Sequence, residues 1–500
     1  MTKIISMAMV MSIAGALSAA SARAQTYQPS YGAATPVAYD NADYYADEGA
    51  KSPSDKPPVP MAPKATEPAP AAAAPADAAA PAAGACGCNA GGCGSGGGDC
   101  CKLTCPDQTI TRLFGDCCWL KCHDVTVQGW MEAGYAWHDG QRNPDGFNGP
   151  DGFNDRDEEV QLNQFYVTIQ KALKDNACCW DWGYTVDLLY GTDYRYPVEK
   201  GWDANDSGVP RWYSDPRKFY GLAMPQAYVE FGTQCLSYKV GRWVTLLGNE
   251  VIAAPGNVFY SHTYTFLYAI PFTHTGALAT YKANDQLTLV QGVDNGWDTF
   301  NDTDENVSFT GEAILTSKDK HTTLTVAYQD GNEPIVSSGN PTADPRARRN
   351  RFVATGILAH DLNDRLSYEI DDTFGCQEKG EAEGDTSTWG GVSSIVTYKM
   401  NCCWTAATRL EWFRDTDGTR VAPIGDFGTP NGNVASAGGF AGNFYDLTAG
   451  LNYHPNANVQ VRPEIRYDWF SGHDLNGVAP YHAGTSNHQW IASTDVIWQF

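Results

Sequence analysis

The chain has 500 residues, with 58 Asp and Glu against 34 Lys and Arg, a formal net charge of −24 and a mean hydropathy of −0.38. This acidic balance excludes nucleic acid as a partner, because phosphate binding needs clustered Lys and Arg. Beyond the N-terminus no run of about 18 apolar residues occurs, which excludes transmembrane helices.

Residues 1–24 have the pattern of a secretory signal peptide. Lys3 supplies a positive start, residues 4–17 form an apolar run, and Ala22-Arg23-Ala24 is a cleavage site of the A-x-A kind. The alternative is an uncleaved anchor helix, for which the apolar run is short. We therefore expect an exported protein.

Residues 25–84 are rich in Ala, Pro, Asp and Tyr. Such a composition cannot bury a core, so it predicts a disordered linker. Its expected role is reach across the periplasm or the cell wall, and the alternative is a tether without a function of its own.

Residues 85–123 form a Cys-rich, Gly-rich segment with a small internal repeat. Asp99-Cys100-Cys101-Lys102-Leu103-Thr104-Cys105 matches Asp116-Cys117-Cys118-Trp119-Leu120-Lys121-Cys122. No C-x₂-C knuckle for zinc and no C-x-x-C-H for haem occurs, although the looser C-x₃-C does. In an exported chain disulfides suit this pattern better than a metal, so no metal site is predicted. The disulfide candidates in the repeat are Cys100, Cys101, Cys105, Cys117, Cys118 and Cys122.

Residues 124–500 alternate between polar and apolar side chains, as strands with one face in lipid and one in water do. In 459–469, for example, Val, Pro, Ile, Tyr and Trp alternate with Gln, Arg, Glu and Asp. The predicted fold is all-β: a transmembrane antiparallel β-barrel of about sixteen strands, with fourteen to eighteen as the range. The predicted strands are 124–137, 159–172, 179–191, 222–232, 235–244, 275–283, 286–294, 306–316, 321–330, 350–361, 365–375, 387–400, 403–414, 442–454, 458–470 and 487–500.

Short connections alternate with long ones along these strands, which is the asymmetry between the two ends of an outer-membrane barrel. An even number of strands places both ends of the barrel, and the Cys-rich segment, on the periplasmic side. Further disulfide candidates lie at or beside the short turns, namely Cys178, Cys179, Cys235, Cys402 and Cys403. Only Cys376 falls on an outer loop. We expect disulfides that fasten the N-terminal segment under the barrel or crosslink neighbouring envelope proteins.

Strand parity predicts a wall of mixed charge inside the barrel, because a lipid-facing charge is costly. The alternative is a plugged polar interior that does not conduct. The predicted pore-lining residues are Asp181, Asp187, Lys239, Glu369, Asp371, Arg409, Glu411, Arg462, Glu464, Arg466 and Asp468.

The first long loop, 138–158, repeats Asp-Gly-Phe-Asn at 145–148 and 151–154 and continues with Asp155, Asp157 and Glu158. Oxygen ligands at this density are typical of calcium sites, but no EF-hand pattern fits. A solvated loop is the favoured interpretation.

The third long loop, 245–274, is rich in aromatic residues. Aromatic side chains at that density are expected to pack against the inner wall rather than to face water. We predict a constriction built partly from Glu250, Tyr260, His262 and Tyr264. The alternative is an outward loop in a trimer contact.

Four motifs carry a resemblance to a known family: Val240-Gly241-Arg242-Trp243, Gly248-Asn249-Glu250, Asn257-Val258-Phe259-Tyr260-Ser261 and Pro271-Phe272-Thr273-His274-Thr275-Gly276. They resemble the bacterial outer-membrane β-barrel porin family of the OmpL-like kind. The similarity covers roughly 124–500 and is strongest at 240–281. It implies an outer-membrane barrel and passive passage of small solutes, and in sixteen-stranded porins generally the third loop folds into the channel. The parity of Arg242 matches outward Tyr238 and Val240, so we expect Arg242 to face outward.

Outside the barrel the resemblance is one of composition. The linker and the Cys-rich segment resemble envelope proteins of cysteine-rich, planctomycete-type bacteria. The chain also ends on Phe500, and such an aromatic carboxy-terminus is similar to the insertion signal of outer-membrane barrels.

The predicted function is that of an outer-membrane porin for small hydrophilic solutes or ions, without a cofactor and without catalysis. The expected partners are outer-membrane lipid, the solutes, a homotrimer and disulfide-linked envelope proteins. The alternative function is a structural envelope protein that uses the barrel as an anchor. An enzyme is the third hypothesis, but no catalytic cluster supports it.

Overall fold

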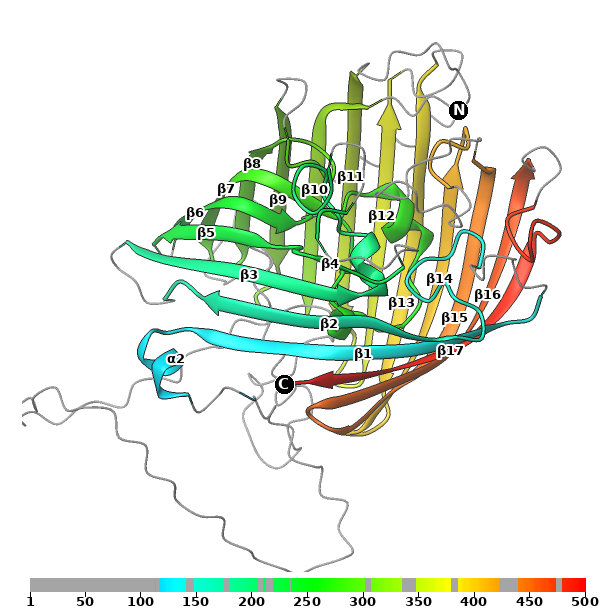
Figure 1. The fold of residues 1–500 in the computed structure, drawn as a ribbon, viewed down its shortest axis with the longest axis horizontal. Helices are drawn as coiled ribbons and strands as arrows, with labels where there is room; N and C mark the ends of the chain where they lie inside the picture. The colour runs from blue at the N-terminus through cyan, green and yellow to red at the C-terminus, as the bar shows by residue number, and fades with distance from the viewer. Residues whose placement is uncertain are drawn as a thin grey trace, which may run out of the picture.

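The computed structural model describes Leu113 and residues 117–140, 148–174, 180–205, 210–212, 219–233, 235–301, 307–334, 348–378, 385–421, 439–473 and 479–500. The predicted signal peptide, the linker and most of the Cys-rich segment lie outside the described residues. Within the described part, long antiparallel strands close into one barrel (Figure 1).

The strands follow one another around the barrel in chain order. Their bounds are β1 (Thr126–His138), β2 (Val160–Lys171), β3 (Asp181–Gly191), β4 (Gly221–Ala223), β5 (Ala227–Gly232), β6 (Leu236–Val244), β7 (Thr273–Asn284), β8 (Leu287–Asp294), β9 (Ser308–Thr316), β10 (Thr322–Pro334), β11 (Arg348–Asp361), β12 (Leu366–Gln377), β13 (Ser387–Lys399), β14 (Trp404–Asp415), β15 (Ala441–Asn456), β16 (Val459–His473) and β17 (His488–Gln499).

The strands β4 and β5 occupy one position in the barrel. Both pair with β3, through Leu189↔Ala223 for β4 and Val186↔Ala227 for β5. The seventeen segments therefore form sixteen positions, and the predicted all-β, sixteen-stranded antiparallel barrel is confirmed. The break falls at 224–226, where the chain leaves the ladder for three residues.

The barrel closes between its first and last strands. Pairs run from Trp130↔Gln499 to His138↔Ile491. At the seam, the amide of Gly129 donates to Phe500 O over 2.9 Å, and the amide of Phe500 donates to Gly129 O over 2.8 Å. Every described strand edge is thus paired, as the hydrocarbon layer requires.

Asparagine side chains close three of the tight turns at one end of the barrel. The Oδ1 atoms of Asn284, Asn363 and Asn401 each accept two backbone amides from residues two and three positions later, over 2.8–3.1 Å. This local hydrogen bonding is why Asn favours such turns. Because strands alternate in direction, these turns share one end with the start of β1 and with Phe500.

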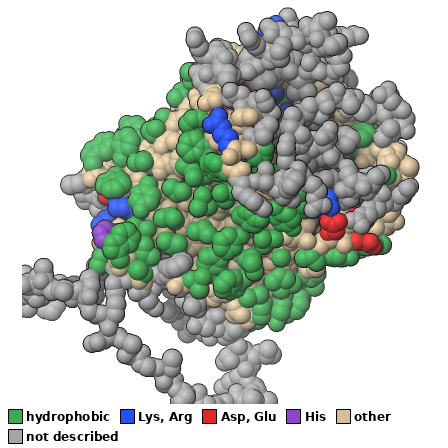
Figure 2. All heavy atoms as spheres, in the orientation of Figure 1, with side chains coloured by type: hydrophobic (Ala, Val, Ile, Leu, Met, Phe, Trp, Pro, Cys, Tyr) green, Lys and Arg blue, Asp and Glu red, His purple; other side chains and the backbone are tan. Residues whose placement is uncertain are grey.

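The outer face of the barrel is apolar and the inner face is polar. Figure 2 shows a broad band of hydrophobic side chains on the wall that faces the viewer. Along β16 and β17 the outward Ile465, Trp490 and Trp498 are exposed, whereas Arg466, Ser493 and Asp495 between them are buried. The predicted alternation of these strands is confirmed.

Arg242 keeps the predicted parity of the outward residues but is covered by the second outer loop. Its register with Ala227 and Thr275 continues unbroken from exposed Val240. It is nevertheless 1% exposed, because its Nε lies 3.0 Å from Glu199 and its guanidinium donates to Asp203 and to the carbonyl of Pro197. The preceding Gly241 has a φ of +132°, which side chains with a Cβ rarely adopt.

Helical segments in the described residues are short. They comprise α2 (Cys118–Cys122) before β1, the 3₁₀ turns η1 (Thr192–Arg195) and η2 (Ala254–Gly256), and the π-helical turn η3 (Thr265–Ala269). None of the described helices has the length and apolar character needed to cross a bilayer.

Candidate functional site

The candidate site is the inside of the barrel, where the third outer loop, 245–272, meets the inward side chains of the strands. Its turn η3 lies inside the barrel against β12 and β13 (Figure 1). Thr245 and Phe272, at the two ends of the loop, are joined by a backbone hydrogen bond of 2.9 Å. The loop thus leaves the wall after β6 and re-enters it at the neighbouring strand β7. Between these points it folds into the barrel, rather than projecting outward as in the alternative.

Arginines of the wall hold the backbone carbonyls of this loop. The guanidinium of Arg462 donates to the carbonyls of Ala254 and Asn257 over 3.0 and 2.7 Å. Arg409 donates to Ser261 O over 2.6 Å, and Arg466 donates to the carbonyl of His262 over 2.6 Å. The planar guanidinium suits this task, because it offers several donors in a fixed arrangement.

Glutamates of the same wall hold the loop amides. The two oxygens of Glu464 accept the successive amides of Tyr260 and Ser261 over 2.9 and 3.0 Å. The two oxygens of Glu411 accept the successive amides of Tyr264 and Thr265 over 2.8 and 2.7 Å. Hydrogen bonds to a charged acceptor are stronger than neutral ones, so each glutamate fixes two peptide units.

Glu250 joins the loop to the wall through a buried charge pair. Its carboxylate lies 3.1 Å from Nη1 of Arg409 and 3.2 Å from Nδ1 of His262, and it accepts the amide of Thr263 over 2.8 Å. Burial by itself raises the pKa of Glu250, but these three partners together lower it to about 2. Burial lowers the pKa of His262, against the opposing effect of Glu250. The pair therefore joins an ionised carboxylate to a histidine that is neutral near pH 7.

The first part of the loop contacts other walls. Asn249 donates its backbone amide to Asp371 and its side-chain amide to Glu369, each over 2.9 Å. On the far side, the side chain of Gln164 on β2 donates to Ile252 O over 2.6 Å. The loop is thereby fixed to β12 and to β2, on either side of its arginine contacts.

The predicted pore-lining residues all lie on inward positions, and they fall into two groups. Those in contact with the third loop are Glu369, Asp371, Arg409, Glu411, Arg462, Glu464 and Arg466. Asp468 supports this group by binding Arg466 over 2.7 Å. Asp187 and Lys239 lie on β3 and β6, away from the loop, and half-buried Asp181 lies 3.6 Å from Lys171 near the turn end.

The four predicted constriction residues are brought together in the loop. Glu250, Tyr260, His262 and Tyr264 are each less than 8% exposed. The hydroxyl of Tyr260 donates to Asn163 over 2.9 Å, and that of Tyr264 lies 2.8 Å from the hydroxyl of Tyr481. Their burial follows from contact with the wall, as their aromatic character predicts.

The first outer loop corrects the expectation of a solvated segment. Asp151, Asp155 and Asp157 are buried, and their carboxylates lie next to Arg466, Arg195 and His138 at 3.4, 2.8 and 3.1 Å. Within the described residues no group of acidic, His or Cys side chains has the arrangement of a metal site. These carboxylates therefore serve as ion-pair partners of the barrel.

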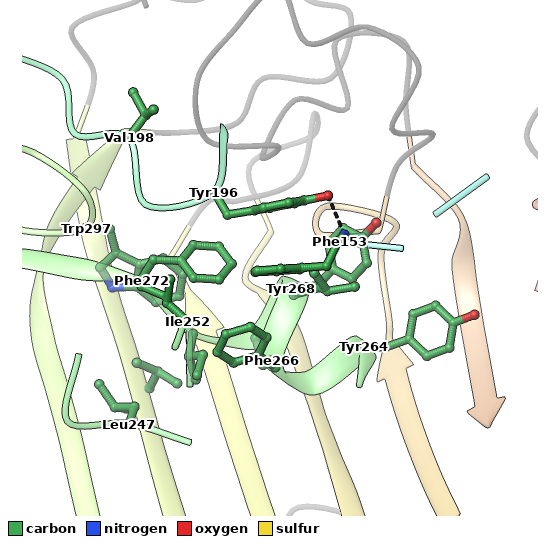
Figure 3. Close-up of a cluster of buried hydrophobic side chains, with 14 of the residues drawn as sticks. Phe153, Tyr196, Val198, Leu247, Ile252, Tyr264, Phe266, Tyr268, Phe272 and Trp297 are labelled. Atoms are coloured by element: carbon green, nitrogen blue, oxygen red, sulfur yellow. Dashed lines mark hydrogen bonds between the residues drawn. The ribbon is translucent and has the colours of Figure 1, made fainter. Parts of the chain in front are cut away.

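Aromatic side chains of the first three outer loops meet in one cluster (Figure 3). Phe153 stacks on Tyr196 with ring centres 4.0 Å apart, and its amide donates to the Tyr196 hydroxyl over 2.7 Å. Phe153 also packs against His262 and Phe266 of the third loop, at 4.1 and 5.7 Å. The loops thus support one another at the outer side of the lumen.

Sequence reasoning missed the residues of β2 that take part. Asn163 and Gln164 are both buried, because β1 and β2 shift register between Glu132 and Ala133. The sequence does contain a signal for this irregularity, because Asn163 and Gln164 are two successive polar residues in a strand that otherwise alternates. Such a break in period is typical of a β-bulge.

Several of the cysteine candidates lie at the turn end of the barrel. Cys117, Cys235 and Cys403 carry free thiols, Cys122 is exposed, and Cys402 takes part in a disulfide. The side chains of the remaining candidates, Cys100, Cys101, Cys105, Cys118, Cys178 and Cys179, lie outside the described residues. Cys376 lies on β12 near the opposite end.

Comparisons with known proteins agree with a barrel that crosses the outer membrane. Residues 124–500 match the family model described as Putative beta-barrel porin-2, OmpL-like. No curated protein matches the chain. The match does not extend to residues 1–123, so the compositional resemblance to planctomycete-type envelope proteins stays a prediction.

Three solved structures are similar in fold. The outer membrane channel DcaP of Acinetobacter baumannii has 10% identity and a TM-score of 0.48, over 75% of this chain and 97% of that one. An anion-selective porin from Comamonas acidovorans has 8% identity and a TM-score of 0.49, over 75% and 99%. OprB of Pseudomonas putida has 9% identity and a TM-score of 0.49, over 80% and 100%.

The family match covers more than half of the chain and coincides with the closed barrel. The chain belongs to the Putative beta-barrel porin-2, OmpL-like family, and it is an outer-membrane porin.

Proposed function

We propose that small hydrophilic solutes diffuse passively through this barrel and that the third loop narrows their path. The observation that carries the proposal is the fixed position of residues 249–265 inside the barrel, held by Arg409, Arg462, Glu411 and Glu464. A polar inner wall suits hydrated solutes, and an immobile loop sets an upper limit on their size.

Single-channel conductance of the full chain in planar bilayers tests this proposal. Discrete steps that are proportional to voltage are the expected result. A folded, heat-modifiable barrel without conductance would contradict it and favour the polar, non-conducting interior.

A second variant tests the constriction itself. Thr245 and Phe272 are hydrogen-bonded neighbours, so a short Gly-Ser hairpin can replace residues 246–271 without separating β6 from β7. We expect conductance to rise several-fold, because the lumen loses its obstruction. Unchanged conductance would place the narrowest point elsewhere.

A structural role in the envelope is the second candidate function. It is supported by the position of Cys117, Cys235, Cys402 and Cys403 at the same end of the barrel as β1 begins. We infer that this end faces the periplasm and that disulfides there join the N-terminal segment or neighbouring envelope proteins. Mass spectrometry that finds all these thiols free in native envelopes would refute this role.

A homotrimer remains part of the proposal. Chemical crosslinking of the protein in native membranes, followed by electrophoresis without heating, counts the copies. A single-copy species at all crosslinker concentrations would exclude the trimer.

A further inference from the structure

The charges buried inside the barrel and its inner loops are strongly unequal. Among the described residues, twenty-one buried carboxylate side chains stand against eight buried lysine and arginine side chains. A lumen with an excess of one sign attracts ions of the opposite sign and repels those of its own. The imbalance concerns the inside of the barrel, so it is distinct from the net charge of the whole chain.

The buried arginines are engaged with the protein. Five of them lie within 4.0 Å of a carboxylate, namely Arg195, Arg242, Arg409, Arg462 and Arg466. The other two, Arg351 and Arg420, stack on the ring of Trp297 at 4.5 and 4.8 Å. Their charges are therefore neutralised or shielded locally and offer little to a free anion.

Lys239, the one lysine that is buried among the described residues, also contacts an aromatic ring. The Nζ atom of Lys239 lies 3.9 Å from the centre of the Tyr228 ring, and Lys239 is paired in register with Glu230. A cation over an aromatic face already has an electrostatic partner. The Nζ atom of Lys239 and the Nη1 atom of Arg420 have no hydrogen-bond partner within the described residues, and each of these two cations lies over an aromatic ring.

Oxygen atoms without partners lie on the opposite wall, formed by β8, β9 and β10. The buried atoms Thr288 Oγ1, Asp294 Oδ2, Glu312 Oε2 and Gln329 Oε1 have no hydrogen-bond partner in the protein. A buried acceptor without a donor costs about 1–3 kcal/mol. Four such acceptors on one wall therefore indicate that something other than the protein binds them.

Glu312 lies at the centre of this wall. It is 6% exposed and is paired in register with Val290 on β8 and Ala327 on β10. Thr288 lies two residues before Val290 on β8, and Gln329 lies two residues after Ala327 on β10. Both side chains therefore face inward and are diagonal neighbours of Glu312, one on each side. Diagonal positions in a sheet are within reach of a long side chain. The result is a line of acceptors with a carboxylate in its middle, and His274 lies at one end of it, 3.6 Å from Asp294 and 3.3 Å from Gln329.

The polar contacts of the third loop lie away from this wall. The hydrogen bonds of loop residues 246–270 go to the loops, to β2 and to β11–β16, and none within the described residues reaches β8, β9 or β10. Apolar loop residues such as Leu247 and Ile252 instead share a buried cluster with Val290 and Ala327, the neighbours of Glu312. The loop therefore leaves the four oxygen atoms without a hydrogen-bond partner in the described part of the chain.

We propose that the porin selects for small cations over anions, and that they pass along the acceptor wall of Thr288, Glu312, Gln329 and Asp294. This inference rests on the proposed diffusion function and adds the class of solute. Small cations such as K⁺ prefer oxygen ligands, and the wall supplies carboxylate, hydroxyl and amide oxygens.

The reversal potential of the full chain in a planar bilayer, measured across a KCl gradient near pH 7, tests the inference. The expected sign is that of K⁺ preference over Cl⁻. Glu312→Gln should reduce the permeability ratio by at least about twofold, since it removes the central carboxyl group of the wall. Glu312→Lys should reduce the ratio further.

The matched control is Asp319→Asn, which removes one charge from the exposed turn 317–321 at the end of the barrel. Its ratio should equal that of the unchanged protein. Equal permeability of K⁺ and Cl⁻, anion preference, or a Glu312→Gln channel with an unaltered ratio would each overturn the inference. A complete lack of conductance would instead overturn the proposed diffusion, and the cation preference with it.

Discussion

At the scale of single residues, Glu250 has the largest share in fixing the third loop. Its side chain forms an ion pair with a wall arginine, at 3.1 Å from Arg409. Arg409 also binds Asp446 over 2.9 Å, so the wall and the loop share one network. The sequence identified Glu250 by its place in an aromatic loop, but its partner on the wall, Arg409, is 159 residues away, which no local pattern reveals.

Glu250→Gln removes the loop carboxylate and leaves Arg409 with Asp446 as its ion-pair partner and with its hydrogen bonds to Ser261. We expect the free energy of unfolding to fall by about 3 kcal/mol, the range for breaking a buried ion pair. Urea titration of the barrel in lipid vesicles measures this. Glu378→Gln, at an exposed position after β12, should change the value by less than about 0.5 kcal/mol. Equal losses in the two variants would mean that Glu250 does not anchor the loop.

The same carboxylate gives a pH dependence with a defined sign. Its pKa in the folded protein is about 2, below the ordinary 4.5, so its stabilisation is complete above about pH 4.5 and is lost as the pH falls toward 2. The difference in unfolding free energy between the unchanged protein and Glu250→Gln should therefore be constant above about pH 5 and shrink near pH 3. Urea titrations at both pH values measure it, and a difference that grows in acid would refute the assignment.

At the scale of elements, strand positions were predictable and their irregularities were not. Alternation located all sixteen strands because one face meets lipid and the other meets polar groups. The burial of Arg242 depends on Glu199 and Asp203 of the second loop, which no pattern in β6 reveals. The gap between β4 and β5 contains Pro225, which has no amide to donate to the ladder, and the strand prediction passed over it. The burial of Asp151 and Asp155 depends on Arg466 and Arg195, which are distant in sequence.

Two glycines in strands give a matched test of this irregularity. In Gly241→Ala the new Cβ would lie 2.3 Å from Ala227 O at a φ of +132°, whereas at Gly356 a Cβ meets nothing within 4 Å. Gly241→Ala should lower the unfolding free energy by about 2 kcal/mol, the range for a strained backbone. Gly356→Ala should leave it unchanged or raise it by about 0.5 kcal/mol. Similar values for both variants would show that β6 adapts without strain.

At the scale of the whole molecule, the barrel separates an apolar outside from a polar inside. The separation was predictable from sequence because it repeats in every strand. The contents of the lumen were not, since the path of residues 246–271 is set by contacts with β2 and β11–β16. Ion selectivity was not predictable from the sequence for the same reason. The alternation of the strands shows that charges of both signs face the lumen, but it does not show which arginines are paired with carboxylates.

A charge on the outer face should be costly in this arrangement. Leu410 is 54% exposed on β14 and lies between the inward residues Arg409 and Glu411. Leu410→Arg should lower the unfolding free energy by about 2–4 kcal/mol if its position is near the bilayer midplane. Leu410→Met keeps an apolar side chain and should cost less than about 1.5 kcal/mol. Equal costs in lipid vesicles would mean that this part of β14 does not face hydrocarbon.

The seam between β1 and β17 also has a consequence for biogenesis. Until the twelve residues of the last strand, His488–Gln499, are in place, both β1 and β16 present a strand edge without a partner. The hydrocarbon layer does not tolerate such edges, and pairing that joins residues so distant in sequence is slow. The protein therefore cannot insert strand by strand as it emerges. A copy that lacks β17 cannot close the barrel, so closure by the final strand is a condition for stable insertion.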